Sequence, residues 1–239
     1  MSDSDENWDF YLTLLDGAPA SVRVDLRWMT EPLPVDCTHL HVAFLPMAEP
    51  EEHGMGGPVD RDRLEAVEQQ VFERVRSAGG VPVGRLRNRG RWQLCAYGTE
   101  ALEWQHWLAE LGPEGTEIAT QPDQHSAYLL SVLLPTPERQ LWMLSRRAVD
   151  QLENHGDLLH LPRAVHHRFS FGAERPPAEF LAELRGRDFE VEVTPAGARS
   201  TRFDSVELED IHPLVVELVS LADHHGGEYE GWDCDLEAE

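Results

Sequence analysis

The stretch FEVEVTPAGARSTRFDSVEL, residues 189–208, decides the fold that we predict for the second half of the chain. In its first six residues apolar side chains alternate with polar ones, which is typical of a strand with one buried face. The turn Pro195-Ala196-Gly197 then leads into a second alternating run at 200–208. The stretch therefore predicts a β-hairpin.

Helical patterns lie on both sides of this hairpin. One helix is expected at 177–186, with Pro177 in its first turn, and another at 211–225, for which Asp210 is the expected N-cap. A leading helix at 139–155 and strands at 164–171 and 228–236 complete the predicted elements. After the leading helix the predicted order is β-α-β-β-α-β.

The first half of the chain predicts the same order from residue 38 onward. The expected strands are 38–45, 81–86, 91–97 and 116–120, and the expected helices are 61–78 and 100–111. Ahead of them a hairpin turns at Asp16-Gly17, between runs at 8–14 and 21–28. We predict an α+β protein with domains at 1–135 and 136–239. Each is expected to be a ferredoxin-like α/β sandwich (βαββαβ), a four-stranded antiparallel sheet with helices on one face.

Length and composition are those of an ordinary globular protein. The 239 residues are 41% hydrophobic and 8% aromatic, which excludes collagen, general disorder and a disulfide-knitted miniprotein. No apolar run approaches the roughly 18 residues that cross a bilayer, and the acidic start at residues 1–6 is unlike a signal peptide. We expect a cytoplasmic monomer without a membrane segment. Its three cysteines, Cys37, Cys95 and Cys234, are expected to be buried thiols.

The charge of the chain is strongly negative and unevenly spread. Twenty basic residues, all arginine, stand against 44 acidic ones, so the formal net charge is -24. Residues 61–98 carry a local excess of basic residues, whereas residues 203–239 hold 12 acids and no Arg or Lys. Such a charge disfavours direct binding of nucleic acid, because it repels the phosphate backbone. It favours a basic protein partner, although a solvated acidic surface explains it equally well.

Motifs for catalysis or metal binding are absent from the sequence. The densest histidine group, His155, His160, His166 and His167, matches no zinc-ligand spacing, and we expect His167 to be a core imidazole with a hydrogen-bond partner. No G-x-S-x-G, P-loop, G-x-G-x-x-G or H-E-x-x-H is present. We therefore predict no catalytic residues, no metal and no cofactor.

The most distinctive local sequence is GGEYEGWD, residues 226–233. Gly231 permits a bulge inside the last strand, and two aromatic residues stand among acids. The aromatics either complete the core or form a binding edge, and both interpretations stay open. On the second interpretation the predicted partner-binding residues are Asp204, Glu207, Glu209, Asp210, Glu228, Tyr229, Glu230, Trp232, Asp233 and Asp235.

Three segments, NHGDLL (154–159), PRAVHH (162–167) and LADHHGGEYEGW (221–232), resemble the regulator of ribonuclease activity B family. In that family an Asp usually stands where this chain has Glu230. The first half is similar to a bacterial family of unknown function that is often fused to the first, through Trp8, Tyr11 and the turn at 16–21. The resemblance implies an acidic cytoplasmic protein of ferredoxin-like fold that binds the endoribonuclease RNase E, or a similar ribonuclease, and restrains it without chemistry of its own.

Two other functions stay open at this point. The acidic surface also fits an immunity-type inhibitor of a cationic toxin. The histidines between His155 and His167 leave open a metal-dependent hydrolase.

Overall fold

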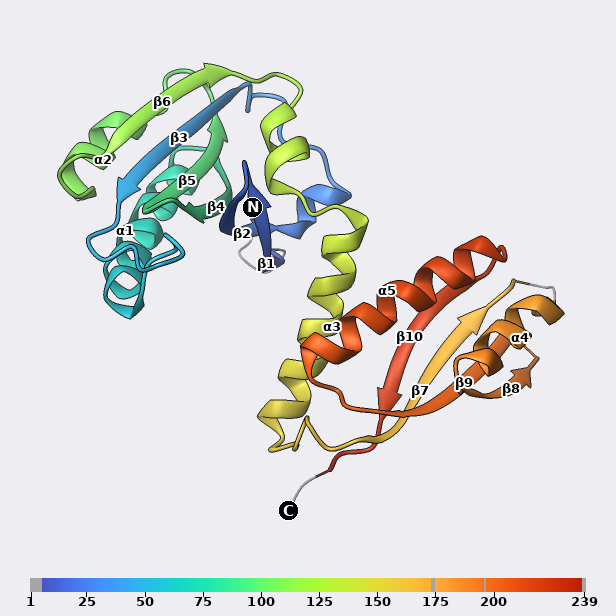
Figure 1. Ribbon diagram of the computed structural model, residues 1–239. Coiled ribbons are helices and arrows are strands. Elements are labelled where there is room, and N and C mark those ends of the chain that lie inside the picture. The colour runs from blue at the N-terminus through green and yellow to red at the C-terminus, as the bar shows by residue number, and fades with distance from the viewer. Residues whose placement is uncertain (1–5, 173–174, 196, 238–239) are drawn as a thin grey trace. The chain divides into compact units, whose positions relative to one another are not determined.

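The structure is a computed structural model that describes residues 6–172, 175–195 and 197–237 (Figure 1). The chain divides into two compact units, Met1–Thr136 and Pro137–Glu239. Ala196, in the turn of the predicted hairpin, lies outside the described residues.

The N-terminal unit is built on one antiparallel sheet with the strand order β1-β2-β4-β5-β3-β6. Its strands are β1 (Trp8–Leu15), β2 (Ala18–Asp25), β3 (His39–Pro46), β4 (Val81–Asn88), β5 (Arg91–Gly98) and β6 (Glu117–Pro122). Its helices are the 3-10 helix η2 (Leu26–Met29), α1 (Pro58–Ser77), α2 (Trp104–Leu111) and the π-helical η3 (Leu129–Leu133). The sheet has six strands, two more than predicted, because the first hairpin pairs along the free edge of β4.

Helices α1 and α2 pack on one face of this sheet, over the fully buried Trp92 and Leu94 of β5 (Figure 1). On the other face lies η3, which the sequence did not predict. Its Leu133 is fully buried, and a Cβ at Gly84 of β4 would lie 3.1 Å from the Leu133 side chain. The hydroxyl of Tyr11 donates a hydrogen bond to the Leu133 carbonyl at 3.1 Å. The small residue in β4 therefore makes room for η3 against the sheet.

The C-terminal unit contains a four-stranded antiparallel sheet in the order β10-β7-β9-β8. Its elements are α3 (Pro137–Asn154), β7 (Arg163–Ser170), α4 (Ala178–Gly186), β8 (Glu190–Thr194), β9 (Gly197–Asp204), α5 (Leu208–His224) and β10 (Glu228–Cys234). The core includes Phe169 of β7, Phe180 of α4 and Leu218 of α5, so α4 and α5 cover the same face. The α+β class with two antiparallel sheets is confirmed, and both units contain the predicted order β-α-β-β-α-β.

The observed helices begin one to four residues away from the predicted starts, and the reason is clear for α2 and α5. Helix α2 begins at Trp104 rather than at residue 100, after a turn in which the Leu102 amide donates to the Thr99 carbonyl. Helix α5 begins at Leu208 with Glu207 at the N-cap, so Asp210 lies in the first turn and is not the cap. Burial of apolar side chains on either side of the first turn explains this earlier start of α5, because Val206 and Ile211 are both 0% exposed.

The sequence also led to predictions about the cysteines and about membrane-spanning segments. Cys37 and Cys95 are buried, as expected, whereas Cys234 is only half-buried. Among the described residues, no helix combines the length and the apolar character needed to cross a bilayer.

Candidate partner-binding surface

Strand β10 forms one edge of the C-terminal sheet and carries half of the predicted binding residues. It pairs with β7, and the register shifts between Tyr229 and Gly231. Gly231 has φ +120°, and the shift leaves Glu230 as the extra residue of a β-bulge. Because a bulge reverses the alternation of the residues that follow it, Tyr229 and Trp232, three positions apart, both lie on the helix-covered face.

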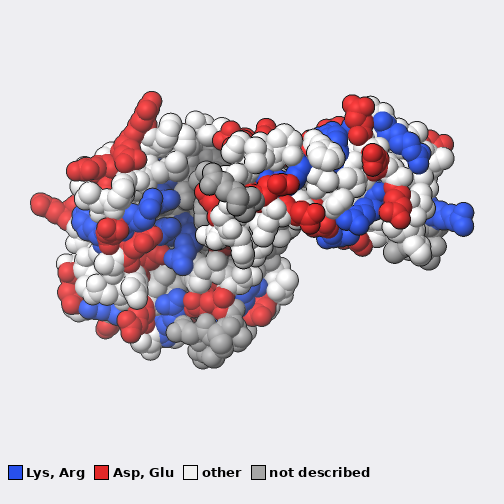
Figure 2. Space-filling model, turned by 90° about the horizontal axis from the view of Figure 1, so that it is seen from below, with Lys and Arg blue, Asp and Glu red and all other residues white. Residues whose placement is uncertain are grey.

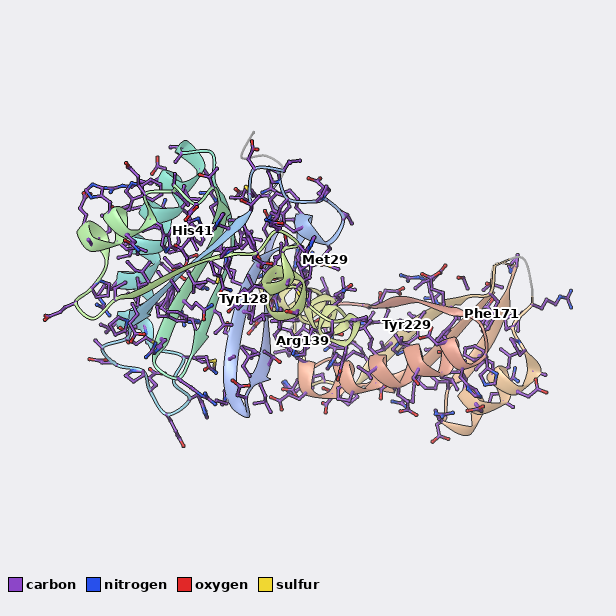
Figure 3. All side chains as sticks on the ribbon, turned by 90° about the horizontal axis from the view of Figure 1, so that it is seen from above. Met29, His41, Tyr128, Arg139, Phe171 and Tyr229 are labelled. Atoms are coloured by element: carbon purple, nitrogen blue, oxygen red, sulfur yellow. The ribbon has the colours of Figure 1, made fainter. Side chains whose placement is uncertain are left out.

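Tyr229 is partly buried and packs against the core of the unit. Tyr229 is labelled among the side chains of this unit (Figure 3). Its hydroxyl lies 2.9 Å from Nδ1 of His167, and its ring packs edge-on against Phe169. His167 is fully buried, and burial together with the charge of Arg202 lowers its pKa to about 3. Burial also raises the pKa of the Tyr229 hydroxyl. His167 is thus a core imidazole with a partner, as expected, and Tyr229 is partly buried against the same core.

Trp232 is half-buried and lines a groove of about 300 Å³ between α3 and β10. The groove is lined by Ala148, Gln151, Leu152, His155, Trp232, Asp233, Cys234 and Leu236. Leu236, at the end of the groove, is 53% exposed, so an apolar surface remains open to solvent there. The arrangement suits one apolar side chain of another molecule between Trp232 and the C-terminal half of α3.

Two of the ten predicted residues are carboxylates already neutralised within the chain. Asp233 lies on the sheet face away from α4 and α5, where it forms an ion pair with Arg168 and lies 3.7 Å from Arg199. Asp204 accepts a hydrogen bond from Nε of Arg202 at 2.9 Å. Both carboxylates therefore offer less charge to a partner than the sequence implied.

The other six acids are exposed, and none forms an ion pair with a described residue. They are Glu207, Glu209, Asp210, Glu228, Glu230 and Asp235. Acidic side chains are prominent in the space-filling view, with arginines among them (Figure 2).

The strand register separates these acids into two groups. Glu228 pairs with Ser170 at one end of β7, and Cys234 pairs with Val165 toward the other end, where Asp204 of β9 also lies. The acids after β9 and Asp235 after β10 thus share the end of the sheet near the groove. Glu228 lies at the opposite end and Glu230 two residues nearer, about 20 Å and about 15 Å away at roughly 3.3 Å per residue.

A buried ion pair near the groove was not predicted. Nη1 of Arg163 lies 2.5 Å from Oδ2 of Asp157, and both side chains are almost completely buried. Arg163 also donates to the carbonyls of Leu158 and Asp235, and the Glu237 amide donates to Asp157 at 2.9 Å. The pair therefore ties the chain after β10 to the loop after α3. The signal was in the sequence, because both residues belong to the segments that carry the family resemblance.

The histidines of residues 155–167 do not converge on one point. Nδ1 of His155 contacts the Gln151 carbonyl at 2.6 Å, and Nδ1 of His166 contacts the Thr201 hydroxyl at 2.8 Å. Across the described part of the chain, no three His, Cys, Asp or Glu side chains are grouped as metal ligands. The hydrolase hypothesis therefore gains no support from the geometry of this segment.

Comparison with known families follows the division into units. Residues 6–133 match the model of a family of unknown function (DUF695), and residues 142–234 match the model of regulator of ribonuclease activity B. No curated protein and no solved structure matches the chain. Because the first match spans more than half of the chain, this protein belongs to the DUF695 family, and its C-terminal unit resembles regulator of ribonuclease activity B.

Proposed function

We propose that the chain is a cytoplasmic, monomeric, non-enzymatic regulator that binds an endoribonuclease of the RNase E type and inhibits it. Residues 136–239 form the proposed binding domain. The observation that carries the proposal is the match of residues 142–234 to a family described as a regulator of ribonuclease activity. The N-terminal unit belongs to a family without an assigned function, so the proposal gives it no part in binding.

The chemistry of the surface supports a basic segment as the bound part of the enzyme. Glu207, Glu209, Asp210 and Asp235 are exposed and form no ion pair with a described residue, so their charge is free for a cationic partner. The groove beside Trp232 accepts an apolar side chain from the same segment. The bound segment is therefore expected to be arginine-rich or lysine-rich with at least one large apolar residue.

The first test neutralises the acids near the groove. The triple variant Glu209→Gln, Asp210→Asn and Asp235→Asn is compared with the full wild-type chain in binding to a purified RNase E-type enzyme at low salt. We expect a loss of affinity of about tenfold or more, which corresponds to about 1.4 kcal/mol. The matched control neutralises three exposed acids elsewhere in the unit, Glu179, Glu190 and Glu192, and should bind like the wild type.

The second test separates the two ends of the sheet and the role of the groove. If the enzyme docks at the end of the sheet near the groove, the double variant Glu228→Gln, Glu230→Gln should keep nearly the wild-type affinity. Trp232→Ala should lower the affinity. Wild-type affinity in the groove-end triple variant would show that the docking surface is wrong. A wild-type chain that neither binds nor inhibits the enzyme at low salt would contradict the function itself.

Salt provides a third measurement on the unmodified protein. Exposed charges are screened over about 8 Å at physiological ionic strength, so the affinity should fall steeply as NaCl rises. The affinity of the triple variant should depend on salt less than that of the wild type, because fewer charge pairs form. Equal salt dependence of the two proteins would argue against docking through these acids.

A further inference from the structure

Arg87 in β4 forms no ion pair with any carboxylate of the described residues, although the chain has 44 acidic residues. It is half-buried, its Nε is buried without a hydrogen-bond partner among the described residues, and its Nη2 lies 3.4 Å from the Ser21 hydroxyl. It forms no ion pair with a described residue. A charge taken partly out of water without a counter-charge is costly, so this arrangement calls for an anion.

The strand register places further arginines beside Arg87. Arg23 pairs with Arg85, and Ser21 pairs with Arg87, so all four side chains share the face of the sheet that α1 covers. The guanidinium groups of Arg85 and Arg87 lie 4.4 and 5.5 Å from the centroid of the Trp92 ring. The buried indole ring of Trp92 thus makes cation–π contacts with both guanidinium groups.

The carboxylates of this region are already occupied. Glu68 accepts hydrogen bonds from Arg23 at 3.0 Å, Arg85 at 3.3 Å and the Trp92 indole at 3.0 Å. Glu65 lies 3.2 Å from Arg85. Arg87 therefore forms no ion pair of its own with these carboxylates. Arg61 lies one helical turn before Glu65 in α1, so it lies on the same face of the helix, which is turned toward the arginines of the sheet. Burial and the charges of Arg85 and Arg61 lower the pKa of Arg87 by more than Glu65 and Glu68 raise it.

We propose that Arg87, together with Arg61 and the Ser21 hydroxyl, binds a small oxyanion of the phosphate class. The donors come from β4, α1 and β2, and donors from three elements suit a tetrahedral anion with several acceptor oxygens. The ligand is small, because the net charge of -24 repels a polyanion such as nucleic acid. This site goes beyond the proposed function and lies in the unit to which that function assigns nothing.

The experiment titrates the full chain with inorganic phosphate by isothermal calorimetry, in a chloride buffer of constant ionic strength. We expect saturable binding at one site, and we expect Arg87→Gln to weaken it about tenfold or more. The matched control is Arg185→Gln, an exposed arginine of α4 in the other unit, which removes the same charge and should leave the affinity unchanged.

A second variant keeps the test decisive if Arg87→Gln does not fold. Arg61 is exposed on α1, and its side chain forms no ion pair with a described residue, so Arg61→Gln should fold and bind phosphate several-fold more weakly. Three results would overturn the proposal. They are no saturable phosphate binding to the wild type, an unchanged affinity for phosphate in Arg61→Gln, or displacement of phosphate by chloride at equal concentration. Because the probe is phosphate alone, these results do not depend on ribonuclease binding.

Discussion

His167 in β7 is a buried imidazole whose Nε2 has no hydrogen-bond partner among the described residues. Its pKa in the folded chain is about 3, below the ordinary value of 6.5. Above pH 6.5 the imidazole is neutral in both states. Below it the unfolded chain takes up the proton and the folded chain does not, so the folded state loses stability as the pH falls.

This difference predicts a change in the pH dependence of unfolding. Between pH 6 and pH 4 the variant His167→Gln should lose less stability than the wild type, by about 1.4 kcal/mol for each pH unit. Urea unfolding of both proteins at a series of pH values measures this difference in the free energy of unfolding. His160→Gln, the same substitution at an exposed histidine, is the control and should keep the wild-type slope. Parallel curves for wild type and His167→Gln would show that His167 does not cause the loss.

Asp157 is the carboxylate that neutralises the buried Arg163. Asp157→Asn leaves a buried guanidinium without a counter-charge and should lower the free energy of unfolding by about 3–5 kcal/mol. Asp233→Asn is the matched control, because its ion pair with Arg168 is almost half exposed and is expected to contribute about 1 kcal/mol or less. Chemical denaturation of both variants measures the difference, and equal losses would contradict the role given to the buried pair.

At the scale of the element, the bulge of β10 depends on Gly231. Its φ of +120° is unfavourable for residues with a Cβ, although no heavy atom lies within 4 Å of the position that a Cβ would take. Gly231→Ala should therefore cost about 1–3 kcal/mol through the backbone alone. Gly186→Ala, in α4 with equally open surroundings and no positive φ, should be neutral or slightly stabilising. Thermal unfolding compares the two, and a tolerated Gly231→Ala would mean that the bulge does not need glycine.

At the scale of the whole molecule, the two units have separate hydrophobic cores. One core has residues between positions 8 and 118 and the other between 141 and 234. Leu94→Ala should therefore destabilise only the N-terminal unit and Leu218→Ala only the C-terminal unit, each by about 2–5 kcal/mol, because both leucines are fully buried. Hydrogen exchange resolved along the chain measures the two effects. Loss of protection in both units from either change would show that they unfold together.

The sequence by itself determined the class of the fold and the order of its elements. Alternation in strands, three- and four-residue spacing in helices and glycine or proline at turns are local properties, so each element is visible in its own residues. The same local patterns wrongly predicted Asp210 as the N-cap of α5. The helix begins earlier, at Leu208, because Val206 and Ile211 are both buried. It also missed the addition of the first hairpin to the edge of β4, which is a pairing between segments far apart in the chain.

Only the tertiary structure decided how the candidate binding residues are distributed. The bulge before Gly231 places Trp232 on the same face of the sheet as Tyr229, and the strand register separates the exposed acids into two groups. Pairing with arginines from other strands neutralises Asp233, and the absence of such pairing leaves Arg87 without a counter-charge among the described residues. Composition gives the number of charged residues but not which of them form ion pairs. Ion pairs form between residues that are close in space, and these need not be close in the sequence.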